Sequence, residues 1–128
     1  MPKLITSAEI TDIEEFSEIE DDSIFRYCNL SGLVADGKPV DASFIGCNLT
    51  GFDWYWGLFA GCLFADTNFF NCTFRGVNFS GCRFLNCKFE NCVFGEDKLG
   101  KGCGFDDSIW LLCRSKNTVG LPSSVQAE

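Results

Sequence analysis

Large apolar residues recur at every fifth position between Ala42 and Lys101. This segment divides without a gap into consecutive five-residue units, and the third residue of every unit is large and apolar. A period of five fits neither the 3.6-residue period of an amphipathic helix nor the two-residue period of a strand. The pattern therefore predicts a repeat architecture. The central residues are Phe44, Leu49, Trp54, Phe59, Phe64, Phe69, Phe74, Phe79, Phe84, Phe89, Phe94 and Leu99.

Two other positions of the unit are also restricted. The residue two places before the centre is small in most units, and the fifth residue is usually Gly or Asn, which tolerate the positive φ of a sharp bend. Each unit can therefore supply a short extended segment with two inward side chains, followed by a corner. Successive units then turn about a common axis, with coils stacked about 4.8 Å apart. Cysteine fills the small position at Cys47, Cys62, Cys72, Cys82, Cys87 and Cys92.

The units, written mostly as C-(N/x)-F-x-(G/N), resemble the pentapeptide-repeat family, whose consensus is A-(D/N)-L-x-x. The resemblance implies an all-β fold, a right-handed quadrilateral β-helix with four units per coil and about four to five coils. The central residues then form four interior columns, one of which contains Phe59, Phe79 and Leu99. The chain departs from the consensus in using Phe for Leu and Cys for Ala. Phe52 and Trp54 overfill one unit, so we expect a distorted corner there.

The repeat extends beyond the strict run at 42–101 and is predicted to cover residues 23–115. Residues 33–41 are too few for two units and are predicted to form a loop that bulges from the wall. Residues 1–22 are predicted to be an acidic, helical cap, with Ser7, Thr11 or Ser17 as the helix N-cap and a capping box from Thr11 to Glu14. Residues 116–128 are predicted to form a flexible tail.

The nine cysteines are predicted to be buried, reduced thiols that act as small hydrophobic residues. Thiols stacked in successive coils would point in parallel, which suits a disulfide poorly because its Cβ atoms must converge. Their spacing also lacks the C-x2-C pairs of zinc sites. We expect no metal and no cofactor, and Cys113, near the irregular end of the repeat, is the thiol most expected to react.

Charge and motif content narrow the function. The chain has no histidine, no nucleophile motif and no phosphate-binding loop, so we expect a protein that is not an enzyme. The net charge of −8 argues against direct nucleic-acid binding. Residues 1–41 carry ten acidic and three basic residues, whereas residues 42–101 carry five of each. No export signal or membrane span is evident, so a cytoplasmic protein with no membrane contact is expected.

Several apolar residues occupy wall positions that should face solvent. Such patches usually mark contact surfaces, so we expect an interaction site with an unidentified protein partner unless the cap or the 33–41 loop covers them. The favoured function is a non-catalytic interaction scaffold or adaptor. The resemblance offers an alternative, a DNA mimic that modulates a type II topoisomerase, which the neutral walls and short rod disfavour. The patch comprises Tyr55, Trp56, Leu58, Leu63 and Phe70, and a homodimer could form through Ile109, Trp110, Leu111 and Leu112.

Overall fold

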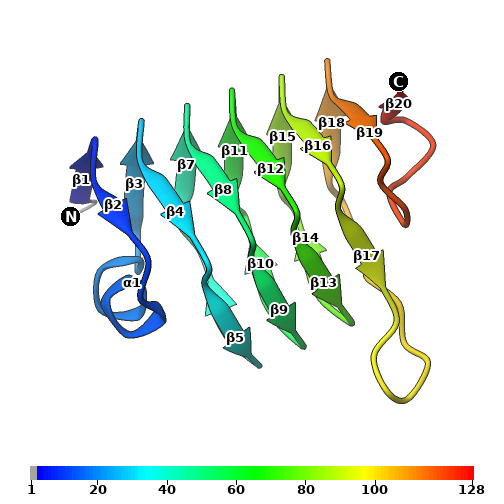
Figure 1. Ribbon diagram of the computed structural model, residues 1–128, viewed down its shortest axis with the longest axis horizontal. Coiled ribbons are helices and arrows are strands. Elements are labelled where there is room, and N and C mark those ends of the chain that lie inside the picture. The colour runs from blue at the N-terminus through cyan, green and yellow to red at the C-terminus, as the bar shows by residue number, and fades with distance from the viewer. Residues whose placement is uncertain (1–2) are drawn as a thin grey trace.

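The computed structural model describes residues 3–128 as a four-sided parallel β-helix of about five turns (Figure 1). Side 1 contains β1 (Lys3–Thr6), β3 (Ser23–Arg26), β7 (Ser43–Ile45), β11 (Leu63–Ala65), β15 (Arg83–Leu85) and β18 (Ile109–Leu111). Side 2 contains β2 (Glu9–Ile10), β4 (Asn29–Ser31), β8 (Asn48–Thr50), β12 (Asn68–Phe70), β16 (Lys88–Glu90), β19 (Arg114–Lys116) and β20 (Gln126–Ala127). Side 3 contains β5 (Val34–Asp36), β9 (Asp53–Tyr55), β13 (Thr73–Arg75) and β17 (Val93–Gly95). Side 4 contains β6 (Pro39–Val40), β10 (Leu58–Ala60) and β14 (Asn78–Ser80).

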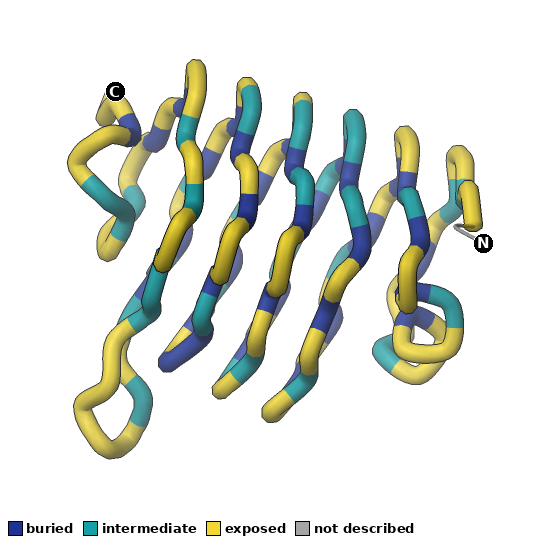
Figure 2. The backbone as a smooth tube through the Cα atoms, turned by 180° about the vertical axis from the view of Figure 1, so that it is seen from behind, coloured by how far each residue is buried: buried dark blue, intermediate teal, exposed yellow. Residues whose placement is uncertain are grey.

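The central aromatic residues stack along the interior. Phe44, Phe64 and Phe84 pair in register on side 1, and their rings lie 5.1 and 4.9 Å apart and nearly parallel. Offset stacks of this kind add stability beyond the area that they bury. Of the twelve central residues of the strict repeat, all except Leu99 are buried. The interior is therefore a continuous, mainly aromatic core enclosed by the four sheets. Buried positions recur along each coil of the backbone (Figure 2).

Where the position two residues before the centre is cysteine or threonine, its side chain also donates a hydrogen bond to the preceding coil. The Cys92 thiol donates to the carbonyl oxygen of Phe69 in the preceding coil at 3.3 Å, and the Thr67 hydroxyl makes the equivalent bond to Phe44 at 3.1 Å. Cysteine and threonine are interchangeable here because both combine small volume with a donor. All nine cysteines are free thiols, and only Cys103 is partly exposed.

The predicted loop at residues 33–41 is wrong, because β5 and β6 form regular sides there. Phe25 pairs with Phe44, 19 positions later, whereas Phe44 pairs with Phe64, 20 positions later. One residue is therefore missing from this coil, and residues 38–41 form a four-residue side. Small central residues, Ala35 and Val40, hid the repeat from the sequence pattern. Because Ala35 lies beside Trp54 in register, it leaves room for the indole, and Phe52 stacks on Trp54 at 5.4 Å inside the core.

The N-terminal prediction of a helical cap holds only for α1 (Ile13–Ile19). Residues 3–10 form strands instead, because Ile5 and Ile10 pair in register with Phe25 and Leu30 and so begin the first coil. Residues 1 and 2 of the predicted cap lie outside the described residues. Helix α1 then stands where sides 3 and 4 of the first coil would be. Its buried Phe16 stacks on Phe25 at 5.5 Å and so closes this end of the core.

The helix N-cap differs from all three predicted residues. Asp12 occupies this position, and its carboxylate accepts a hydrogen bond from the Glu14 amide at 3.1 Å. The side chain satisfies one of the free amides of the first helical turn. Ser7 lies at a corner with φ of 56°, and Ser17 lies within the helix, so neither can cap it.

Residues 97–102 are an insertion, which we call the arm. The offset between Arg83 and its partner Ile109 is 26 positions instead of 20, so this coil contains six extra residues. The predicted core position of Leu99 is therefore wrong: its side chain is 83% exposed on the arm. Phe105 takes the interior place and stacks on Phe79 at 5.4 Å with an interplanar angle of 8°.

The predicted flexible tail is also wrong in part, because residues 118–127 pack across the C-terminal end of the helix. β20 pairs with β19, Val119 forms a bridge with Val93, and Val125 is buried. Gly120 passes so close to β17 that a Cβ atom there would lie 1.9 Å from the Phe94 carbonyl oxygen. These contacts cover apolar side chains that the last coil would otherwise leave in water.

Candidate interaction site

The five residues of the predicted surface patch separate into two groups. Tyr55 ends β9, Trp56 forms the corner after it, and Leu58 begins β10, so these three lie together at the edge between sides 3 and 4. Leu63 lies on side 1 and Phe70 on side 2, and both are half-buried. The candidate site is therefore the edge around Trp56, and the other two residues do not belong to it.

The arm, and neither the cap nor a 33–41 loop, lies against this edge. The Trp56 indole nitrogen donates to the Asp97 carboxylate at 2.6 Å, and the Lys98 amide donates to the Tyr55 hydroxyl at 3.0 Å. Trp56 and Leu58 nevertheless stay 45% and 41% exposed. The arm therefore holds the indole in place without covering the apolar surface.

Asp97 organises the arm. One carboxylate oxygen accepts from the amides of Leu99 and Lys101 at 2.8 and 2.9 Å, and the other accepts from Trp56. The pKa of Asp97 is lowered, first by the backbone bond from Lys101 and then by the indole, because these bonds favour the charged carboxylate. A single ionised side chain thus fixes both the turn of the arm and its contact with the wall.

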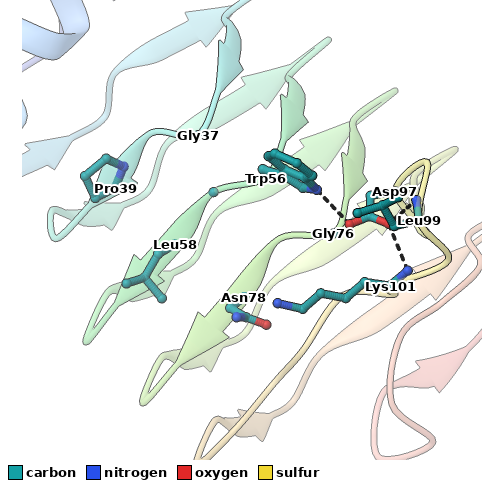
Figure 3. A pocket seen from close by; sticks show the side chains of 10 residues that line it. Gly37, Pro39, Trp56, Leu58, Gly76, Asn78, Asp97, Leu99 and Lys101 are labelled. Carbon is teal, nitrogen blue, oxygen red and sulfur yellow. Dashed lines mark hydrogen bonds between the residues drawn. The ribbon is translucent and has the colours of Figure 1, made fainter.

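Between the arm and side 4 lies a groove of about 470 Å³ (Figure 3). Pro39, Leu58 and Trp56 line one part, Asn78 and Lys101 another, and Leu99 projects from the arm. Gly57 forms part of the floor directly above Trp54: a Cβ atom there would lie 2.4 Å from the indole Cδ1. The sequence interpretation missed Pro39, Asn78, Leu99 and Lys101. The one-residue frame shift before Cys103 was the available signal that residues 97–102 leave the wall.

The side chains that line the groove are suited to binding a partner. Its lining combines apolar side chains, one amide, one ammonium and a carboxylate that is already hydrogen-bonded. Among residues 3–128, no group of three or more potential metal-ligating side chains comes together. The arrangement suits recognition of an apolar side chain next to a polar or charged group.

The pKa values of the cysteine thiols differ with their position in the helix. Burial raises the pKa of Cys47 to about 11, whereas a hydrogen bond with Cys87 lowers that of Cys113 to about 7. The side-chain hydrogen bond with Cys82, together with burial, raises the pKa of Cys62. Cys113 lies under the terminal strand β20, whose Gln126 amide bonds to its carbonyl oxygen at 3.3 Å. The Cys113 thiol therefore ionises more readily than an ordinary cysteine, although it is buried and Cys103 is the partly exposed thiol.

The apolar C-terminal run lies on the last strand of side 1. Ile109, Leu111 and Leu112 are exposed, but Trp110 turns inward and stacks on Phe84 at 4.0 Å. Only three of the four residues predicted to form a dimer contact are thus available at the surface. Within residues 3–128, none of the helices has the length and apolar character needed to cross a bilayer.

Comparisons with known proteins find one family match, to part of the chain, and several similar structures. The family described as Pentapeptide repeats matches residues 58–95, with eight copies. A pentapeptide repeat protein, Rfr23 from the cyanobacterium Cyanothece 51142, has a similar structure with a TM-score of 0.51 and 12% identity, over 84% of this chain and 96% of that one. Trypsin-treated QnrB1, a plasmid-mediated fluoroquinolone resistance protein, aligns over 100% of this chain and 83% of its own, with a TM-score of 0.44 and 10% identity. No curated protein sequence matches. Residues 58–95 are therefore pentapeptide repeats, and the four-sided helix is similar in fold to a pentapeptide repeat protein.

Proposed function

We propose that the protein is a non-catalytic interaction scaffold that binds a protein partner through the groove beside the arm. The observation that carries this proposal is the exposure of Trp56, Leu58 and Leu99 around one concave surface. Exposed apolar side chains gathered in this way are typical of contact surfaces. The stacked core beneath is rigid, so the groove keeps its shape before the partner arrives and little ordering entropy is lost on binding.

Comparative affinity capture tests this proposal. Leu58→Ser removes an apolar contact from the groove, and Leu4→Ser is a matched control because Leu4 is also exposed but lies on β1 at the far end. A partner recovered by the natural protein and by Leu4→Ser, but lost by Leu58→Ser, supports the proposal. Equal recovery of every partner by both variants contradicts it.

A homodimer through Ile109, Leu111 and Leu112 is a further part of the proposal. It is supported by the outer edge of β18, which pairs with β15 on one side only and carries these exposed residues. Two such edges could pair about a two-fold axis. Sedimentation should then show a dimer that Leu111→Lys converts to a monomer, and a monomeric natural protein at all concentrations tested would rule it out.

The alternative function, a DNA mimic that modulates a type II topoisomerase, draws support only from the exposed acids Glu14, Glu15 and Glu18 of α1. A mimic needs negative charge along the rod, whereas residues 42–101 carry five acidic and five basic residues. Supercoiling assays at two salt concentrations separate the two functions. Binding of the enzyme that weakens as salt rises would favour the mimic over the scaffold.

A further inference from the structure

The free charge in the groove is positive although the chain as a whole is acidic. Lys101 extends along the groove, and its ammonium points toward Asn78 (Figure 3). The one ion pair among residues 3–128 is Lys38–Glu20, so no carboxylate lies within ion-pair distance of the Lys101 ammonium, although its charge contributes to the lowered pKa of Asp97. Asp97, the other charged lining residue, already accepts bonds on both oxygens. Lys98 adds a second exposed ammonium on the arm. An incoming carboxylate therefore meets an ammonium that makes no ion pair in the described chain.

The outer side chains of side 4 change character along the helix axis. Pro39, Leu58 and Asn78 lie in register on three neighbouring strands, and Lys101 lies beside Asn78. The groove is thus apolar toward β6 and polar and cationic toward β14. One to two strand spacings, about 5–10 Å, separate the apolar contact from the ammonium. An extended chain covers that distance in about two or three residues.

From this arrangement we propose that the groove binds an extended acidic peptide segment lying along the helix axis. A large apolar side chain of the segment packs against Leu58 and Trp56, and an Asp or Glu two or three positions away pairs with Lys101. This inference rests on the proposed scaffold function and adds the chemistry and spacing of the partner segment.

A peptide is favoured over a membrane surface as the occupant. The apolar contact lines a groove of about 470 Å³ between the arm and side 4, which the side chain of a peptide can enter. The net charge of −8 also repels an anionic membrane. Leu99 offers a further exposed apolar contact from the arm.

The test uses the full chain and an array of capped peptides, each containing one Leu and one Glu separated by one to five positions. Matched arrays carry Gln or Lys in place of Glu. We expect strongest binding at a separation of two or three, weaker binding as salt rises, and about tenfold weaker binding of the Gln peptides. Equal binding of Glu and Gln peptides, no dependence on separation, or no binding at all would overturn the inference.

Substitutions at Lys101 test whether this side chain provides the charge contact with the peptide. Lys101→Met keeps the aliphatic chain and the backbone amide bond to Asp97 but removes the charge, and it should weaken the Glu peptides about tenfold while leaving the Gln peptides unchanged. Lys116→Met, on side 2, is the control and should change neither. Lys101→Glu should prefer the Lys peptides. Anionic vesicles provide the other arm: vesicle binding that depends on Leu99 and competes with the peptides would point to a membrane and contradict the inference.

The two proposals can fail separately. If Leu58→Ser loses a captured protein while no acidic peptide binds, the scaffold function stands and the acidic segment is wrong. If Leu58→Ser retains every captured partner, the scaffold function itself falls. Self-association of the chain that Lys101→Met abolishes would identify a second copy as the occupant, and it would replace the peptide in this inference.

Discussion

Phe79 and Leu99 occupy the same slot of the repeat in the sequence and opposite environments in the structure. Phe79 is 1% exposed in the aromatic core, and Leu99 is 83% exposed on the arm. Both are the third residue of an apparently regular five-residue unit, 20 positions apart, which is one coil. The difference shows that the spacing alone does not place a residue in the wall.

Strand pairing decides between the two environments. Phe79 pairs with Phe59 in register, whereas Leu99 has no partner strand within the described chain, and Phe105 stacks on Phe79 in its place. Phe105 is preceded by Cys103, whose thiol donates to the Phe74 carbonyl oxygen at 3.3 Å, as the other inner thiols do to preceding coils. The small donor at Cys103 thus marks Phe105 as a wall centre, whereas Phe79 has Val77 at that position and is placed by its pairing with Phe59.

The largest effect is expected from Phe79→Ala. The substitution leaves a cavity between Phe59 and Phe105, and we expect a loss of about 3–5 kcal/mol in the free energy of unfolding. Denaturant melts measure it. A loss below about 1 kcal/mol would mean that the stacked column contributes little to the free energy of unfolding and that Phe79 and Leu99 do not differ in this respect.

A smaller loss is expected from Gly57→Ala. The added methyl group would lie 2.4 Å from the Trp54 ring and 3.0 Å from the Lys38 carbonyl oxygen. Overpacking of this kind costs about 1–3 kcal/mol. Gly102→Ala, on the arm, is the control because nothing lies within 4 Å of the new Cβ atom. Equal stability of the two variants would show that the wall accommodates the added methyl group as readily as the arm does.

Thiol labelling compares the interior with its end. Because the pKa of Cys113 is lowered to about 7 and that of Cys47 is raised to about 11, the reactive thiolate of Cys113 forms as pH rises through about 7 and is lost below it. We expect Cys113 to react first in the native protein, with a rate that rises around pH 7. Cys113→Ser should abolish the fast phase. Rapid labelling of most of the nine thiols would instead indicate an open core.

The smallest effect is expected from Leu99→Ala. The side chain is mostly in water, so the free energy of unfolding should change by less than about 0.5 kcal/mol. The same melts used for Phe79→Ala provide the measurement. A loss approaching that of Phe79→Ala would mean that the arm folds back into the column in solution.

The sequence predicted the walls wherever each unit carries its own large centre. The columns from Phe44 to Phe94 follow directly, because a residue of this size at every fifth position has only one place to pack. Ala35 and Val40 were not recognised because they are small centres; Ala35 lies in register beside Trp54, which follows 19 positions later, and Val40 lies beside Phe59. Such compensation is not local and leaves no periodic signal.

The groove could not be predicted from the sequence for a related reason. Tyr55, Trp56 and Leu58 were identified because apolar residues at wall positions stand out, but the partner of Trp56 lies 41 residues away at Asp97. Nothing in the local sequence around Asp97 indicates an indole, and the five-residue count placed Leu99 inside. The separation of Leu63 and Phe70 from the patch likewise depends on which side each strand occupies.

The hydrogen bond between Trp56 and Asp97 affects how the protein unfolds. In a solenoid each coil touches only the coils before and after it, so unfolding can spread from an end one coil at a time. Trp56 and Tyr55 belong to the coil that begins at β7, and Asp97 and Lys98 to the coil that begins at β15, two coils further on. The arm therefore ties together next-nearest neighbours. The coil between them cannot loosen alone, and the C-terminal half of the rod should unravel as one cooperative block.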